Sequence, residues 1–121
     1  MLHGAAADKT SWSRFAKHLD SKLRRVIPDM AGHGTSTADI NLDYSINAQA
    51  ERLKELLTAL GIKRVHLIGN SMGGAIAIHL ASTSPDLVSS LVLIDTAGVE
   101  ASPSWLHQHS ACGTHRHQSN D

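Results

Sequence analysis

The most regular pattern of apolar and polar positions lies in the middle of the chain. Apolar residues recur there every third or fourth position, at Ile46, Ala50, Leu53, Leu57 and Leu60. This spacing predicts a helix with one apolar face. Ser45 is placed to cap the start of that helix, and Gly61 is placed to end it. An earlier and shorter helix is predicted by apolar residues at helical spacing, namely Trp12, Phe15, Ala16 and Leu19. Ser11 is placed to cap it.

Short apolar runs between the helical patterns predict strands at residues 26–27, 65–68 and 91–94. The last run is continuously apolar, as expected of a parallel strand that is covered on both faces. A second long helix is predicted over about residues 72–82, with Pro85 just beyond its end. Strands that alternate with helices in this way predict an α/β fold with a mainly parallel sheet.

The character of the chain changes after about Ala101, where apolar periodicity stops. We therefore expect a folded core over residues 1–100 and an aperiodic, His-rich tail over residues 101–121. The tail holds possible zinc or copper ligands at His107, His109, Cys112, His115 and His117. Structural zinc sites need turns that hold the ligands in a tetrahedron, and nothing around these residues predicts such turns. The favoured interpretation is a disordered tail, and no metal or other cofactor is expected.

Composition narrows the functional classes further. The 121 residues suffice for one small domain, and 11 basic residues balance 11 acidic ones. This balance suggests neither a nucleic-acid partner nor an anionic membrane surface. No apolar run approaches the roughly 20 residues that cross a bilayer, and the first residues do not form a secretory signal. We expect a soluble, cytoplasmic protein with no membrane span.

The chemistry is concentrated in the segment from Gly69 to Gly74, which reads Gly-Asn-Ser-Met-Gly-Gly and lies between a predicted strand and a predicted helix. A serine on such a sharp turn needs neighbours that have almost no side chain, and Gly69 and Gly73 meet this need. Gly74 would let the helix pack closely on the sheet. The turn also places Ser71 at a helix N-terminus, where free backbone N–H groups favour a developing oxyanion. A glycine-rich turn could instead only pack tightly or bind phosphate, but the spacings typical of phosphate loops are absent.

Four segments together resemble successive landmarks of the α/β-hydrolase family, in its order and spacing. They are His3-Gly4-Ala5, Asp29-Met30-Ala31-Gly32-His33-Gly34, Gly69-Asn70-Ser71-Met72-Gly73-Gly74 and Leu93-Ile94-Asp95. Within that family the chain is similar to lipases and esterases of the monoacylglycerol-lipase type. The carbon–carbon bond hydrolases of aromatic degradation are also similar.

The resemblance implies a role for several residues. Ser71 matches the nucleophile, and the backbone N–H groups of Ala5 and Met72 match the oxyanion hole. Residues 29–34 match a loop that shapes one wall of the site. The implied partner is a small-molecule ester or acyl substrate. A serine at the elbow argues against the dehalogenase and epoxide-hydrolase branches.

The chain departs from the family in its catalytic acid and base, which the resemblance places after the serine. His79 lies eight residues along a helix from Ser71, about 12 Å away, which is beyond hydrogen-bond reach. Asp95 ends a strand; a structural role is favoured over a role as the acid. No general-base role is expected for His3, His33 or His66. The chain could therefore be an inactive fragment of an esterase, or a non-catalytic remnant that serves as an interaction fragment.

The family's strand order, 1-2-4-3-5-6-7-8, predicts an incomplete sheet. Strands 1–2, most of strand 3 and strands 7–8 are missing, and only Met1-Leu2 remain of strand 3. Unpaired groups in a buried sheet each cost about 1–3 kcal/mol, against about 5–15 kcal/mol for the stability of a whole domain. We therefore expect a truncated gene product of low stability, with residues 91–94 as an exposed apolar edge.

Overall fold

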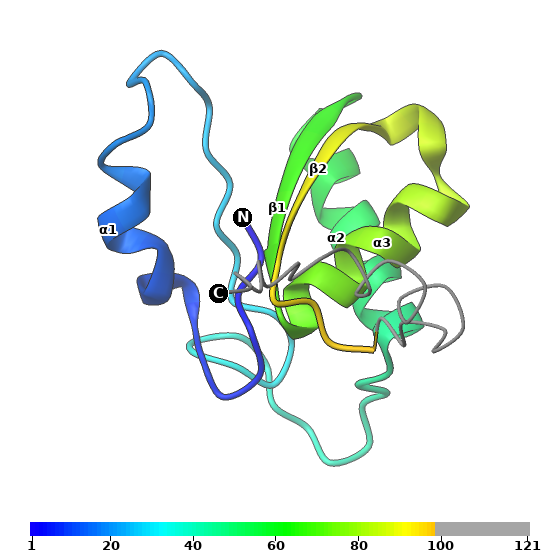
Figure 1. Cartoon of the computed structure of the whole chain (residues 1–121). Helices are drawn as coiled ribbons and strands as arrows, with labels where there is room; N and C mark the ends of the chain where they lie inside the picture. Colours follow the sequence, from blue (N-terminus) through cyan, green and yellow to red (C-terminus); the bar gives the residue numbers. More distant parts are fainter. Residues whose placement is uncertain (99–121) are drawn as a thin grey trace, which may run out of the picture.

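The computed structural model describes residues 1–98, and its centre is a two-stranded parallel sheet. Strand β1 (Val65–Asn70) pairs with strand β2 (Val88–Ile94), and the long helix α3 (Met72–Thr83) connects them. Helix α3 and helix α2 (Ile46–Ala59) lie together on one side of the sheet, and the short helix α1 (Ser13–Ala16) lies on the other (Figure 1). This architecture confirms the expected α/β class.

Helix α2 forms where the apolar spacing predicts it. The Ser45 side chain accepts a hydrogen bond from the N–H of Ala48, at 3.2 Å. Gly61 follows the helix with φ +68°, a conformation that favours glycine. The middle of the predicted stripe faces the interior, because Ala50, Leu53 and Leu57 are buried. Its last member, Leu60, instead follows the helix and is exposed.

Helix α3 packs between α2 and the sheet, and this packing forms the core. The core contains buried apolar side chains from α2, β1 and α3, from the N-terminal segment and from one loop, namely Leu2, Met30, Ala50, Leu53, Leu57, Leu67, Ile76, Ala77 and Leu80. Thr83 ends α3, and Pro85 begins a short 3-10 helix, η2 (Pro85–Leu87). The predicted position of Pro85 beyond the helix is therefore confirmed.

The first two residues lie between β1 and the segment around Val26. The Leu2 N–H donates to the carbonyl of Ile68 at 2.8 Å, and the Asn70 N–H donates to the carbonyl of Leu2 at 3.1 Å. On the opposite side, the Met1 nitrogen donates to the carbonyl of Val26 at 2.8 Å. This placement agrees with the strand order that the resemblance implies.

Two predicted elements are wrong. Residues 26–27 form no strand, since only the Met1 nitrogen bonds this stretch and no ladder develops along it. The predicted helix through Leu19 is instead a 3-10 helix, η1 (Lys9–Trp12), followed by the single turn of α1. The cap of η1 is Asp8 rather than Ser11, because the Asp8 carboxylate accepts a hydrogen bond from the Thr10 N–H at 2.8 Å. The Ser11 hydroxyl instead donates to the Asp8 carbonyl.

Strand β2 forms as predicted but is not covered on both faces by the residues described. Val92, Leu93 and Ile94 are 50%, 43% and 42% exposed. The expectation of an exposed apolar edge at residues 91–94 therefore describes this part of the chain better. The prediction of a disordered tail and the possible metal ligands at His107–His117 lie outside the described residues.

Candidate active site

Ser71 occupies a sharp turn between the end of β1 and the start of α3. Its φ is 50° and its ψ is −115°, a conformation that costs a residue with a side chain free energy. Four backbone hydrogen bonds hold the turn. The Ser71 N–H donates to the Ile94 carbonyl at 3.0 Å, and the Ser71 carbonyl accepts from the N–H groups of Gly74, Ala75 and Ala97, at 3.0, 3.2 and 3.2 Å. The strained serine is thus tied to both strands and to the helix.

The three glycines around the turn have no room for a side chain. A Cβ on Gly69 would lie 2.5 Å from the carbonyl oxygen of Gly73. One on Gly73 would come closer than 3.0 Å to the Leu2 backbone, and one on Gly74 would come equally close to the Thr96 side chain. Helix α3 can therefore start directly above the strands only because these positions are glycine.

Two backbone N–H groups beside Ser71 lack a protein acceptor within residues 1–98. One belongs to Met72, the first residue of α3, where a helix has no internal partner for it. The other belongs to Ala5, which follows Gly4. A Cβ on Gly4 would lie 3.3 Å from the Cβ of Ser71, so the Gly4–Ala5 segment runs next to the serine.

His3 supports the Gly4–Ala5 segment from inside. Its ring is fully buried, and its Nε2 accepts the N–H of Met30 at 3.0 Å. Nδ1 must then carry the proton, which it donates to the Gly4 carbonyl at 2.9 Å. Both ring nitrogens are engaged, so this histidine has no lone pair available for the Ser71 hydroxyl.

Asp29 joins the loop of residues 29–35 to the segment that follows Ala5. Its carboxylate accepts the backbone N–H groups of Lys9 at 2.7 Å and of Thr35 at 3.0 Å, and it pairs with the Lys9 ammonium at 2.9 Å. The two backbone N–H groups, followed by the Lys9 side chain, hold the pKa of Asp29 far below its ordinary value. A Cβ on Gly34 would strike this carboxylate, which shows how tightly the loop closes on it.

No side chain within residues 1–98 is hydrogen-bonded to the hydroxyl of Ser71. Asp95 directly follows β2 beside the turn, but it is exposed. His66 lies in β1 with its ring 2.8 Å from the Ser90 hydroxyl, and His79 lies in the middle of α3. The described part of the chain therefore brings together a strained serine and two free N–H groups without a base to accept the serine proton.

Two residues near the turn have a role that sequence reasoning did not assign. The Asn70 side chain donates to the Ile94 carbonyl at 3.2 Å, which adds a second bond between the turn and β2. Thr96 forms the surface against which Gly74 packs. Asn70 stands next to the serine in the sequence, but its partner could not be known without the pairing of the two strands.

Comparison with known proteins places these features in a family. A family model described as the alpha/beta hydrolase fold matches residues 1–113. Lipase 3 from Moraxella sp. is 41% identical over 99 residues, which cover 81% of this chain and 31% of that protein. The human monoacylglycerol lipase ABHD6 is 39% identical over 104 residues, which cover 84% of this chain and 31% of that protein. The chain thus spans about a third of the length of these relatives.

Solved structures give the same result. A putative lipase from Acinetobacter baumannii superposes with a TM-score of 0.79 and 33% identity, over 88% of this chain and 39% of that one. The meta-cleavage product hydrolase CumD from Pseudomonas fluorescens superposes with a TM-score of 0.75 and 29% identity, over 80% of this chain and 37% of that one.

Two other features are absent from residues 1–98. No helix there combines the length and apolar character that crossing a membrane requires. No three His, Cys, Asp or Glu side chains in the same range are grouped as metal ligands.

Proposed function

Since the chain belongs to the α/β-hydrolase fold family, we propose that it carries the nucleophile part of a serine hydrolase that acts on small-molecule carboxylic esters. The observation that carries this proposal is the geometry of Ser71. It is a non-glycine residue at φ 50° that directly precedes a helix whose first N–H is free. Strain of this kind is retained where it positions a functional group.

The proposed chemistry starts at the Ser71 hydroxyl. Its Oγ forms a bond to the carbonyl carbon of the ester, and the carbonyl electron pair moves to the oxygen. The N–H groups of Ala5 and Met72 would hold this oxyanion, with support from the dipole of α3. The oxyanion then collapses, the bond between the acyl carbon and the alcohol oxygen breaks, and the alcohol leaves with the proton that the serine gave up. Water next attacks the acyl carbon, the bond to Oγ breaks, and the acid and the Ser71 hydroxyl are released. The serine proton needs a base, which residues 1–98 do not supply.

An ester substrate is favoured by the relatives. Lipase 3 and ABHD6 are named as a lipase and a monoacylglycerol lipase, and the Acinetobacter structure is described as a putative lipase. The similarity to CumD, a meta-cleavage product hydrolase, favours a second candidate, carbon–carbon bond hydrolysis with the same serine. The residues around Ser71 do not separate the two reactions, so the choice between them depends on a substrate assay.

The proposal is tested with a biotinylated fluorophosphonate ester, which phosphonylates a nucleophilic serine. We expect mass spectrometry of the full chain to find the adduct on Ser71 and to find none in Ser71→Ala. Ser82→Ala is the matched control, because Ser82 lies exposed at the other end of α3 and its loss should leave labelling unchanged. Labelling that persists in Ser71→Ala would overturn the proposal. A chain that is not labelled at any pH would favour a non-catalytic interaction fragment.

The pH dependence of labelling reports on the missing base. Without a base, the Ser71 hydroxyl reacts through its rare alkoxide, so the rate should rise steadily with pH and show no plateau near pH 7. Ester turnover should then be about 10⁶-fold below that of an enzyme with a complete triad. A plateau with a midpoint near pH 7 would instead indicate that a histidine of this chain reaches the serine.

A further inference from the structure

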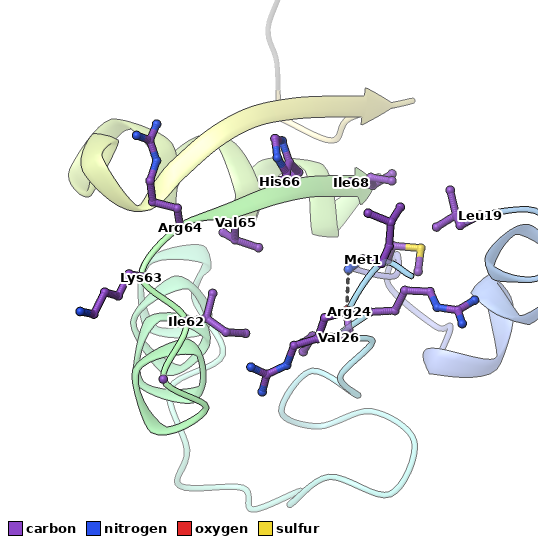
Figure 2. Close-up of a pocket in the computed structure, with 13 residues that line it drawn as sticks. Met1, Leu19, Arg24, Val26, Ile62, Lys63, Arg64, Val65, His66 and Ile68 are labelled. Atoms are coloured by element: carbon purple, nitrogen blue, oxygen red, sulfur yellow. Dashed lines mark hydrogen bonds between the residues drawn. The ribbon is translucent and has the colours of Figure 1, made fainter. Parts of the chain in front are cut away.

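Strand β1 has a regular parallel neighbour at the edge where Leu2 lies. Leu2 donates to the Ile68 carbonyl and accepts from the Asn70 N–H, so its two partners stand two positions apart. This spacing is that of an even parallel ladder. Figure 2 shows Met1 beside Ile68 at this edge, with the Met1 nitrogen bonded to the Val26 carbonyl (dashed). The pairing of Leu2 is therefore the reference for other pairing in this sheet.

Ser71 is paired differently at the edge that faces β2. Its N–H donates to the Ile94 carbonyl, and its carbonyl accepts from the N–H of Ala97, three positions further on. An even ladder would use the N–H of Thr96 instead, so the chain after β2 carries one extra residue opposite Ser71. The register pairs Asn70 with Ile94, so the extra residue enters directly after that pair. The end of β2 thus meets the serine as a one-residue bulge.

Asp95 is the residue that makes this bulge. Its φ is 45°, in the left-handed region, and the chain bends there. A bulge whose first residue is left-handed usually has glycine at that position, and aspartate is among the few other residues that adopt such a φ readily. The Asp95 carboxylate is exposed and pairs with no cation within residues 1–98. Its backbone, rather than its charge, is what the surrounding structure uses.

The bulge also sets where Thr96 packs. A Cβ on Gly74 would collide with the Thr96 side chain, so the residue after Asp95 covers the first turn of α3. Figure 1 shows the chain after β2, in orange, leaving the strand at the start of α3. The same short segment therefore holds both backbone groups of Ser71 and the helix that follows it.

We propose that Asp95 is a positioning residue for Ser71, a role that rests on the proposed hydrolase function and depends on the left-handed backbone rather than on the carboxylate. Without the bulge, the N–H of Ala97 would not reach the Ser71 carbonyl, and Thr96 would not reach α3. The serine could then turn away from the free N–H of Met72, which the proposed oxyanion needs. A catalytic acid at this position would instead require the carboxylate.

The test replaces Asp95 with residues that differ in how well they tolerate the left-handed region. Asp95→Gly and Asp95→Asn tolerate it, Asp95→Ala tolerates it poorly, and Asp95→Val tolerates it least. All four remove the same charge, so differences among them report the backbone and not the carboxylate. We expect fluorophosphonate labelling of the full chain to stay within about twofold for Asp95→Gly and Asp95→Asn and to slow roughly tenfold for Asp95→Val, because small misplacements of a reacting group are costly.

A thiol in place of the Ser71 hydroxyl reports the same positioning without hydrolase chemistry. Each variant is combined with Ser71→Cys and Cys112→Ser, and the rate of alkylation by iodoacetamide is followed against pH. The N–H groups at the start of α3 lower the pKa of a thiol that is held against them. We expect equal midpoints for Asp95→Asn and Asp95→Gly, and a midpoint about half a pH unit higher for Asp95→Val, toward the ordinary value of about 8.5.

Gly61→Val is the matched control for a general loss of stability. Gly61 also has a left-handed φ, of +68°, but it precedes β1 and so lies at the opposite end of that strand from Ser71. Its replacement should lower the midpoint of urea unfolding, as Asp95→Val does, yet leave the labelling rate and the thiol midpoint unchanged. Circular dichroism shows which variants fold, and Asp95→Ala replaces Asp95→Val in every comparison if the latter does not.

Several results would overturn the proposal. Equal labelling and equal thiol midpoints for Asp95→Asn and Asp95→Val would show that the bulge does not position the serine. Loss of labelling in Asp95→Asn and Asp95→Gly alike would assign the role to the carboxylate, as a catalytic acid. A thiol midpoint that shifts as much in Gly61→Val would reduce the effect to lost stability. A chain that is never labelled would contradict the proposed function, while the thiol midpoints would still decide the role of Asp95.

Discussion

At the scale of single residues, the strained backbone conformation of Ser71 also places the serine in the electrostatic field of a helix start. A φ of 50° and a ψ of −115° turn the chain so that α3 starts directly after the serine. The free N–H groups at a helix start favour negative charge, by about 0.3–1 kcal/mol or more at a partly buried site. Ser71 is half-buried, so an anion formed at its side chain should be stabilised.

This stabilisation can be measured with a thiol in place of the hydroxyl. In a chain that also carries Cys112→Ser, the substitution Ser71→Cys should yield a thiol whose pKa lies below the ordinary value of about 8.5. The matched control is Ser82→Cys in the same background, near the C-terminal end of α3, where the dipole disfavours the thiolate. The measurement is the rate of iodoacetamide alkylation against pH. Equal midpoints for the two thiols would contradict the electrostatic role of the helix start.

At the scale of elements, β1 and α3 form a unit because glycines let their backbones touch. Gly69 faces the backbone of Gly73 at a distance that no Cβ would tolerate. The turn and the helix are therefore placed by steric fit rather than by helix propensity, which the two glycines inside α3 lower.

Gly69→Ala should accordingly destabilise the fold by about 3 kcal/mol, because the neighbouring atoms are backbone and cannot rotate away. Gly61→Ala is the comparison, since its φ is +68° but nothing lies within 4 Å of the added Cβ. Its cost should be about 1 kcal/mol, from backbone strain alone. Urea unfolding measures both values, and a smaller loss for Gly69→Ala than for Gly61→Ala would show that the elbow is loosely packed.

The loop of residues 29–35 should give a pH-dependent contribution to stability through Asp29. Its pKa is lower in the folded chain than the value of about 3.9 expected for the unfolded chain. Its stabilising effect is therefore complete above pH 3.9 and is lost as the pH falls through the folded-state pKa.

Replacing the carboxylate isolates this contribution. Asp29→Asn should lower the urea midpoint at pH 7, and the difference from the unchanged chain should shrink steadily below pH 4. Asp86→Asn, at an exposed position in η2, should change stability by less than about 0.5 kcal/mol at either pH. A difference for Asp29→Asn that grows on acidification would contradict the assignment.

At the scale of the whole molecule, the sheet within residues 1–98 has open edges. Within those residues β1 pairs with Leu2 on one side and with β2 on the other, and β2 has no partner on its second side. Val92, Leu93 and Ile94 are each at least 42% exposed along that second edge. Exposed apolar edges promote pairing between chains.

We therefore expect the chain to self-associate through β2, and Val92→Lys to reduce this association. Ile40→Lys is the matched control, because Ile40 is 97% exposed but lies in a loop, so its replacement should have little effect. Light scattering over a range of protein concentrations makes the comparison. If both substitutions reduce association equally, general surface hydrophobicity rather than the strand edge is responsible.

The pattern of apolar and polar residues predicted the structure correctly wherever interactions between near neighbours in the sequence decide it. Helix α2, with its Ser45 cap and Gly61 end, followed from apolar spacing and end signals. Strand β1, helix α3 and strand β2 followed from apolar runs broken by glycine and proline. The predicted helix through Leu19 was wrong, because Asp8 rather than Ser11 caps the segment and a 3-10 helix forms there. The predicted strand at residues 26–27 was wrong, because this stretch receives a backbone hydrogen bond only from the Met1 nitrogen.

By itself, then, the sequence determined the order of the main elements, the Gly-x-Ser-x-Gly turn and the family, because these depend on neighbours within a few positions. Tertiary structure alone decided which groups surround Ser71. The bond from Asn70 to Ile94, the bond from the Met30 N–H to His3, and the pairing of Leu2 with β1 all join residues more than twenty positions apart. Such contacts depend on how strands pair across the fold, and no local pattern along the chain encodes that pairing.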